Sequence, residues 1–429
     1  MKTGNSIQGD SFNTDRLFNY VKRFSFPRLA GTDGEKKAVN LTIKTFKDIG
    51  FDDLEIKEEP FKFSDFYSTT LIKLIMVINL TFSLFLLMFT YINLFFTIII
   101  GGIMVIVVIL IIKGLKHPEN PGFWGEYYGK TVSATNVFVK LPAKNLPSEI
   151  AGNIIISAHL DSKSQTFKTY WRVFFYKIWL YGGIFLGGFL ILLFIRTYTI
   201  IKLNIVIIGI GIWSFTILIA ISNIFLMFLN THNKSPGALD NASGMAVVFE
   251  LSKYFKKDAL DNFNIWFCQF SAEELGTMGS RVFMNNHEDL FIKGRVFQFN
   301  IDMISCASHP KNQVEYLKSY GVLPRKKIAP LLSKYLDNAA LVENVKIKGF
   351  HLSTGAHTDS VPFHLRGFDA VDIVTRESGK YTHNKIDTPD KVDPQILLEA
   401  CLIIKRTILS LDKDYEFLCK NQQLMCNTS

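Results

Sequence analysis

The sequence predicts an α/β layered fold whose polar part is interrupted by four transmembrane helices, arranged as two hairpins. Strand-like and helix-like segments alternate through the polar part as far as about Leu411, which is typical of proteins that pack helices on a central sheet. Hydrophobic residues make up 48% of the 429 residues. They are concentrated in two inserts, which is unlike a purely soluble protein.

The two inserts have the length and composition of membrane spans. Residues 74–112, 178–195 and 203–230 contain no charged residue. A span needs roughly 20 mostly apolar residues, so the first stretch fits two short spans joined by a turn near residues 91–93. The other two stretches fit one span each. We therefore expect the following organisation: hairpins at residues 71–114 and 171–231, and one polar domain assembled from residues 1–70, 115–170 and 232–429.

The polar segments carry the signals of a sheet with helices between its strands. Alternation predicts a strand at residues 54–63, and the continuous apolar run at 153–158 is typical of a buried strand. An apolar face predicts a helix at residues 244–255. Further strands are expected at residues 131–141, 263–270 and 296–301.

Acidic residues and histidines follow several of these strands. In an open α/β sheet, ligand sites gather outside the carboxyl ends of the strands, so residues far apart in sequence can meet there. The candidates are His159, Asp161, Asp240, Glu273, Glu274, Asp302 and His383. Taken singly, each would more often be a helix cap or a solvated polar residue. Their joint occurrence at strand ends predicts a metal site.

The motifs around these residues resemble those of the zinc-dependent aminopeptidases of family M28. The matching segments are Arg28-Leu-Ala-Gly-Thr32, Ser157-Ala-His-Leu-Asp-Ser162, Pro236-Gly-Ala-Leu-Asp-Asn-Ala-Ser-Gly244, Ser271-Ala-Glu-Glu-Leu-Gly-Thr-Met-Gly-Ser280, Phe299-Asn-Ile-Asp-Met303, Thr358-Asp-Ser-Val-Pro-Phe363 and His383-Asn-Lys-Ile-Asp-Thr-Pro-Asp390. They occur in the family's order and leave out both hairpins. The resemblance implies a three-layer α/β/α zinc-peptidase fold with a mixed central sheet.

Carried over residue by residue, the resemblance also implies two zinc ions per chain. One ion would be held by His159 and Asp302, the other by Glu274 and His383, and Asp240 would bridge them. Cobalt or manganese would suit the same ligands.

Four more residues have implied or candidate roles. Glu273 is the implied general base, and Asp161 is implied to orient His159 through the ring nitrogen that is not on the metal. Tyr381 is a candidate for stabilising the oxyanion, although it stands two positions before His383. Asp359 is a candidate supporting residue behind the ligands.

Two alternative functions remain open from the sequence. A glutaminyl-cyclase-like acyltransferase would use a single zinc ion on the same fold, and a membrane receptor or scaffold would have no catalysis. The complete ligand set, with Glu273 beside it, favours a peptidase that removes residues from the amino terminus of peptides.

The split between His159 and Asp240 predicts the topology. Both residues can reach one site only if the insert between them crosses the membrane an even number of times. Lysines and arginines are more frequent at the span ends nearer the polar domain, which favours a cytoplasmic domain. These residues are Lys73, Lys113, Lys116, Lys168, Arg172, Lys177 and Lys234, against Arg196 and Lys202 at the other ends.

The composition favours a lipid bilayer over nucleic acid as a partner of this chain. The formal charge of +9 suits the anionic surface of a lipid bilayer, and no basic recognition motif suggests nucleic acid. An odd number of cysteines, five, argues against a complete disulfide framework. Because the second hairpin leaves from the segment between two ligands, we expect apolar or membrane-associated peptides as substrates.

Overall fold

The protein is represented by a computed structural model, which describes residues 12–114, 119, 129–321, 325–353 and 357–426. The chain divides into two compact units, each assembled from separated segments. The sheet unit comprises Met1–Phe63, Val132–Ser164 and Asn233–Ser429, and the helical unit comprises Ser64–Thr131 and Gln165–His232. Lys116, which enters the orientation prediction, lies outside the described residues.

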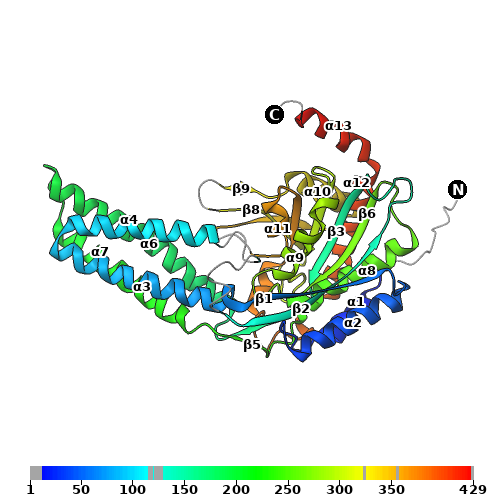
Figure 1. Cartoon of the computed structure of the whole chain (residues 1–429), viewed down its shortest axis with the longest axis horizontal. Helices are drawn as coiled ribbons and strands as arrows, with labels where there is room; N and C mark the ends of the chain where they lie inside the picture. Colours follow the sequence, from blue (N-terminus) through cyan, green and yellow to red (C-terminus); the bar gives the residue numbers. More distant parts are fainter. Residues whose placement is uncertain (1–11, 115–118, 120–128, 322–324, 354–356, 427–429) are drawn as a thin grey trace. The chain divides into compact units, whose positions relative to one another are not determined.

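A nine-stranded mixed sheet forms the centre of the sheet unit (Figure 1). Its order is β1-β2-β6-β3-β7-β11-β8-β10, with β9 paired to β8. The strands are β1 (Ile56–Ser64), β2 (Thr131–Leu141), β3 (Gly152–His159), β6 (Phe263–Phe270), β7 (Val296–Ile301), β8 (Val314–Tyr320), β9 (Lys326–Lys327), β10 (Ile347–Leu352) and β11 (Asp369–Ile373). The four central strands β6, β3, β7 and β11 run parallel. β2 and β8 lie antiparallel to β6 and β11.

Helices cover both faces of this sheet. Alternate residues of β3 point to opposite faces, so Ile154 and Ile156 belong to one apolar cluster and Ile155 to another. The larger cluster adds side chains from α1 (Thr14–Phe24), α2 (Asp33–Ile49), α8 (Ser243–Lys257), α10 (Pro330–Glu343) and α12 (Pro394–Lys413). The smaller cluster adds side chains from α9 (Met278–His287) and α11 (Val361–Leu365). The result is the three-layer arrangement that the sequence predicts.

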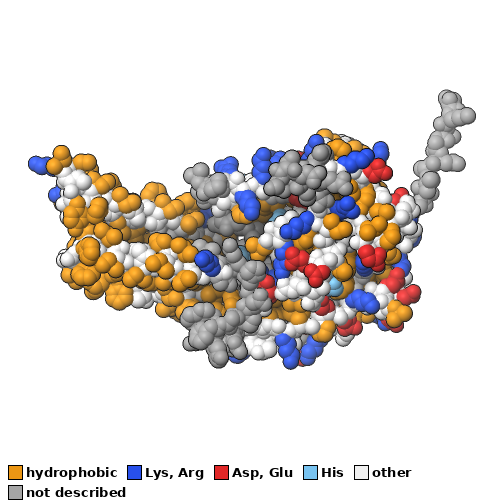
Figure 2. All heavy atoms as spheres, turned by 45° about the horizontal axis from the view of Figure 1, so that its top comes forward, with side chains coloured by type: hydrophobic (Ala, Val, Ile, Leu, Met, Phe, Trp, Pro, Cys, Tyr) orange, Lys and Arg blue, Asp and Glu red, His pale blue; other side chains and the backbone are white. Residues whose placement is uncertain are grey.

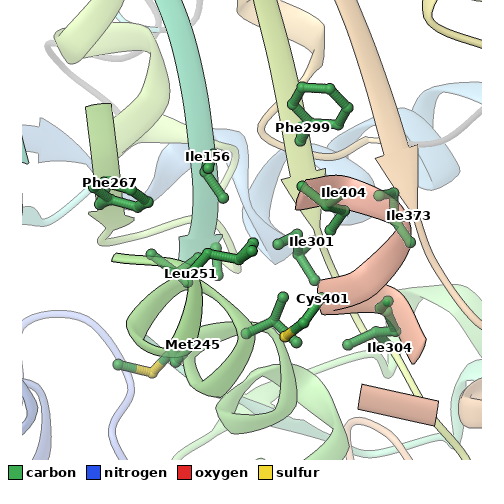
Figure 3. Packing of buried hydrophobic residues seen from close by; sticks show 14 of the residues in the cluster. Ile156, Met245, Leu251, Phe267, Phe299, Ile301, Ile304, Ile373, Cys401 and Ile404 are labelled. Carbon is green, nitrogen blue, oxygen red and sulfur yellow. The ribbon is translucent and has the colours of Figure 1, made fainter. Parts of the chain in front are cut away.

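The larger cluster joins the central strands to α8 and α12 (Figure 3). Ile156 on β3 and Phe267 on β6 lie over Leu251 of α8, and Ile301 of β7 lies near Ile404 of α12. Because these side chains are fully or almost fully buried, they fix the position of each central strand relative to the helix below it. The strand ends that carry the candidate site are therefore set by a packed core.

The helical unit contains four helices that are long and apolar enough to cross a membrane. They are α3 (Thr69–Ile92), α4 (Leu94–Gly114), α6 (Thr169–Tyr198) and α7 (Ile205–Met227). Hydrophobic side chains cover their exposed surface (Figure 2). α3 and α4 meet at Asn93, where the sequence predicts a turn. α6 is longer than its uncharged stretch, because the helix continues through Arg172 and Lys177 at one end and Arg196 at the other.

Buried amides connect the two hairpins of the helical unit. Asn223 of α7 donates a hydrogen bond to the side-chain oxygen of Asn79 on α3 at 2.9 Å, and both side chains are buried. Ser222, next to Asn223, donates to the backbone oxygen of Phe175 on α6 at 2.7 Å. Polar contacts of this kind hold helices together in an apolar environment, where packing alone gives little specificity. A short strand pair, β4 (Ser164–Gln165) with β5 (Thr231–His232), lies where the second hairpin begins and ends.

Candidate metal centre

The predicted site residues follow neighbouring parallel strands at the same edge of the sheet. His159 is the last residue of β3, Glu273 and Glu274 follow β6, and Asp302 follows β7. In the register of these strands, His159 pairs with Phe270 and Ser157 with Asn300, so the three strands end together. Asp240 reaches the same edge from the kinked segment Ala238–Ala242 that precedes α8, in which its backbone is not helical.

His159, Asp240 and Asp302 form the first group of candidate ligands. The Nε2 atom of His159 lies 3.1 Å from Oδ1 of Asp240 and 3.3 Å from Oδ1 of Asp302. Burial, followed by the nearby carboxylates of Asp240 and Glu274, raises the pKa of Asp302 above its ordinary value, while hydrogen bonding to His159 opposes the rise. Two acidic side chains are therefore held together against their mutual repulsion.

Asp240, Glu274 and His383 form the second group. The Nε2 atom of His383 lies 3.1 Å from Oδ2 of Asp240 and 3.2 Å from Oε2 of Glu274. Asp240 thus offers one carboxylate oxygen to each imidazole. Although burial opposes it, hydrogen bonds to both histidines hold the pKa of Asp240 well below its ordinary value.

The chemistry of these donors fits a pair of divalent cations. All five residues are buried, at 7% exposed or less. Each group offers one imidazole nitrogen and two carboxylate oxygens, with its ligand atoms within 4.8 Å of one another. Imidazole and carboxylate are the ligands of catalytic zinc, which keeps a further position open. A cation would also relieve the repulsion of three buried carboxylates.

Asp161 orients both the first histidine and the segment that carries the two glutamates. The Nδ1 atom of His159 lies 3.1 Å from the backbone oxygen of Asp161 and 3.4 Å from its Oδ1. The Asp161 carboxylate also accepts hydrogen bonds from the backbone N–H groups of Glu273 and Glu274, both at 3.2 Å. The sequence suggested the contact with His159 but gave no sign of the second one.

Glu273 precedes Glu274 in the chain and is partly exposed. Burial raises its pKa well above the ordinary value for a glutamate. The neighbouring carboxylates of Glu274 and Asp302 act in the same direction, and His159 acts against them. A carboxylate with a raised pKa is better suited to exchange protons near neutral pH.

The structure places the two remaining candidates differently from the ligands. Asp359 is buried, accepts a hydrogen bond from Ser280 at 2.6 Å, and has its pKa raised to about 7 by burial, with Asp161 and Asp302 contributing. Its second oxygen has no partner among the described residues. Tyr381 donates to the hydroxyl of Ser308 at 3.1 Å, so its recorded hydrogen bond leads away from the ligands.

Arg28 closes the motif that the second hairpin divides. Its fully buried guanidinium donates to the backbone oxygen of Leu160 at 2.6 Å on one side of the insert. On the other side it donates to the oxygens of Pro236 at 2.7 Å and Gly237 at 3.0 Å. Burial lowers its pKa to about 10. The sequence suggested that Arg28 belongs to a family segment but not what it does, because its acceptors are backbone atoms.

Gly237 and Asp387 position Asp240. Gly237 has a φ of 63°, and a Cβ there would lie 2.5 Å from the backbone oxygen of Asp240, so the turn requires glycine. The carboxylate of Asp387 accepts the backbone N–H groups of Leu239 at 2.7 Å and Asp240 at 3.2 Å. Both residues lie within the motifs quoted above, but their roles depend on contacts that sequence does not show.

Part of the chain matches a known peptidase family. Residues 227–408 match peptidase family M28, a segment that contains Asp240, Glu273, Glu274, Asp302 and His383. The aminopeptidase YwaD of Bacillus subtilis (strain 168) is 27% identical over 173 residues, which span 39% of this chain and 36% of that protein. The match therefore covers about a third of that relative's length.

Two solved structures show a similar fold. A zinc aminopeptidase of Bacillus subtilis has a TM-score of 0.53 at 14% identity, over 93% of this chain and 95% of that one. A glutaminyl cyclase of an Acidobacteriales bacterium also has a TM-score of 0.53 at 14% identity, over 96% of this chain and 99% of that one. At this identity the likeness concerns the fold, which the two enzyme classes share.

Proposed function

We propose that this chain is a zinc-dependent aminopeptidase that removes residues from the amino terminus of peptides, because residues 227–408 match peptidase family M28. One observation supports this most directly: two groups of buried ligands share Asp240, and Glu273 stands next to a ligand of the second group. The curated relative that matches the chain is also an aminopeptidase.

In this proposal, His159 and Asp302 would hold one zinc ion and Glu274 and His383 the other, with Asp240 belonging to both groups. Paired zinc ions supply Lewis acidity, which lowers the pKa of a water molecule and polarises the carbonyl of the scissile peptide bond. The Asp161 contacts support the arrangement from behind, because they fix the ring of His159 and the backbone of Glu273 and Glu274.

Glu273 is the proposed general base. Its carboxylate accepts a proton from the attacking water and then donates it to the nitrogen of the leaving amine. Burial raises the pKa of Glu273 above the ordinary value for a glutamate, which is the direction that favours its return of the proton. The Asp161 carboxylate accepts a hydrogen bond from the Glu273 backbone and so fixes the segment that carries this side chain.

A glutaminyl-cyclase-like function is the second candidate, because a glutaminyl cyclase has a closely similar fold. That reaction was expected to need a single zinc ion. The second group of ligands in this chain is as complete and as buried as the first, which favours the peptidase. A scaffold without catalysis is also disfavoured, because neither a ligand nor Glu273 has been lost.

We further propose that the helical unit crosses the membrane four times and that the sheet unit lies in the cytoplasm. The length and apolar surface of α3, α4, α6 and α7 support the crossing. The orientation is supported by charge: Lys73, Lys113 and Lys168 lie at the helix ends that connect to the sheet unit, as do Arg172 and Lys177, against Arg196 and Lys202 at the other ends. Apolar or membrane-associated peptides are the proposed substrates.

Peptide hydrolysis by purified full-length protein tests the function. Glu273→Gln is expected to lower kcat by about 10² to 10⁴, the usual contribution of a general base, while zinc content stays at two ions per chain. Glu149→Gln, at an exposed position of the same unit, is the matched control and is expected to leave both unchanged. Equal activity of Glu273→Gln and wild type would refute the base. Equal rates on apolar and polar peptides would refute the substrate preference.

A further inference from the structure

Lys163 contacts Glu274, a member of the second group of candidate ligands. Its ammonium group lies 2.7 Å from Oε2 of Glu274 and donates to the backbone oxygen of the same residue at 2.9 Å. The backbone N–H of Lys163 donates to the other carboxylate oxygen, Oε1, at 3.2 Å. Only 11% of the Lys163 side chain is exposed. The ammonium is therefore held in place by contacts at both ends of the residue.

The carboxylate oxygen that meets Lys163 is also the one that meets His383. Oε2 of Glu274 is 2.7 Å from the ammonium nitrogen and 3.2 Å from Nε2 of His383. A cation bound by Asp240, Glu274 and His383 would have to share this oxygen with a fixed positive charge. In a buried site, where water screens poorly, two cations at such short range repel strongly.

The first group has no comparable neighbour. The ion pairs of His159 are with Asp161, Asp240 and Asp302, and the ion pair of Asp302 is with His159. Within the described part of the chain, no lysine or arginine pairs with His159, Asp302 or Asp240. The two groups have equivalent donors, but their surroundings differ in charge: the Asp161 carboxylate lies 3.4 Å from His159 of the first group, and the Lys163 ammonium lies 2.7 Å from Glu274 of the second.

We propose that Lys163 is a fixed cation that weakens zinc binding at Asp240, Glu274 and His383. The first zinc ion then enters at His159, Asp240 and Asp302, and the second enters only at a higher concentration of free zinc. Lys163 thereby sets the zinc concentration at which the site fills. This inference rests on the two-zinc site proposed above and adds a residue that determines how the second ion is bound.

Stepwise zinc titration by calorimetry tests the proposal on metal-free, full-length protein in detergent. Lys163→Met keeps the length of the side chain and removes the charge. It is expected to lower the Kd of the second step by about tenfold or more and to leave the first unchanged. Lys163→Arg retains the charge and should resemble wild type. Lys144→Met removes an exposed lysine of the sheet unit that pairs with Asp258, and it should also resemble wild type.

Several results would overturn the role of Lys163. The first is a wild-type protein whose two zinc-binding steps have equal Kd values. The second is a Lys163→Met variant whose second Kd is unchanged. The third is a higher second Kd in Lys163→Met, which would mean that Lys163 orients Glu274 for the metal. Lys163→Gln serves as a second neutral variant if Lys163→Met does not fold. Cobalt titration followed by visible absorption gives an independent count of the steps. A wild-type protein that binds zinc at neither step would instead contradict the proposed function itself.

Discussion

The Arg28 side chain joins the two chain segments that lie before and after the second hairpin. The residues on either side of the second hairpin must return to within bonding distance for His159 and Asp240 to meet. Arginine can do this because its planar guanidinium carries five N–H donors in a fixed fork. Here the guanidinium donates hydrogen bonds to backbone oxygens from three segments, including those of Leu160 and Pro236.

Removing this guanidinium is expected to destabilise the sheet unit. Arg28→Met leaves several buried backbone oxygens without a donor, and each such group costs about 1–3 kcal/mol. A loss of about 3 kcal/mol or more is expected, measured as a lower midpoint of thermal unfolding. Arg23→Met removes a partly exposed arginine of α1 that pairs with Asp48 at 3.4 Å, and it should change little. Equal midpoints for the two variants would contradict the role of Arg28.

The sequence predicted the candidate ligands better than the residues whose contacts hold them in place. His159, Asp240, Asp302, Glu274 and His383 converge as expected, because strand ends and family motifs both mark them. Lys163, Arg28 and Asp387 were not given roles. Their contacts join side chains to backbone atoms far along the chain, and no pattern of residue types reports such contacts.

At the level of elements, the strands and the long apolar helices were predictable for different reasons. The run at 153–158 became β3, because a strand buried on both faces needs apolar residues throughout. The hairpins followed from length and absence of charge. The hairpin predicted at residues 171–231 begins two residues earlier, at Thr169 of α6, and the helix includes Arg172 and Lys177, which interrupt the apolar pattern. Long basic side chains tolerate such positions, since their charged ends can reach water while the stem covers apolar surface.

The proposed membrane orientation predicts which exposed residues would face the outside of the cell. Ile200, between α6 and α7, is 98% exposed, and Leu54 in the sheet unit is 86% exposed. A cysteine at position 200 should react in intact cells with a membrane-impermeant maleimide, while a cysteine at position 54 should react only after lysis. Wild type controls for the native cysteines. The reverse pattern would invert the orientation, and labelling of both residues in intact cells would exclude the proposed crossing.

At the scale of the whole molecule, two units are built from interleaved segments of one chain. The sheet unit brings together His159 and Asp240 although the segment between them forms half of the helical unit. This is possible because α6 and α7 pair as a hairpin and return the chain to its starting side. The division of the ligand motif is therefore a constraint on topology rather than a break in the site.

Removing and restoring zinc tests whether the protein is a zinc-dependent aminopeptidase. Full-length protein is treated with a chelator, and hydrolysis is followed by mass spectrometry on a peptide with a free amino terminus and on its N-acetylated form. We expect the chelated protein to be inactive and added zinc to restore its activity. We also expect that only the first residue of the free peptide is released and that the acetylated peptide stays intact. Hydrolysis that survives chelation, or cleavage within the acetylated peptide, would contradict a zinc-dependent aminopeptidase.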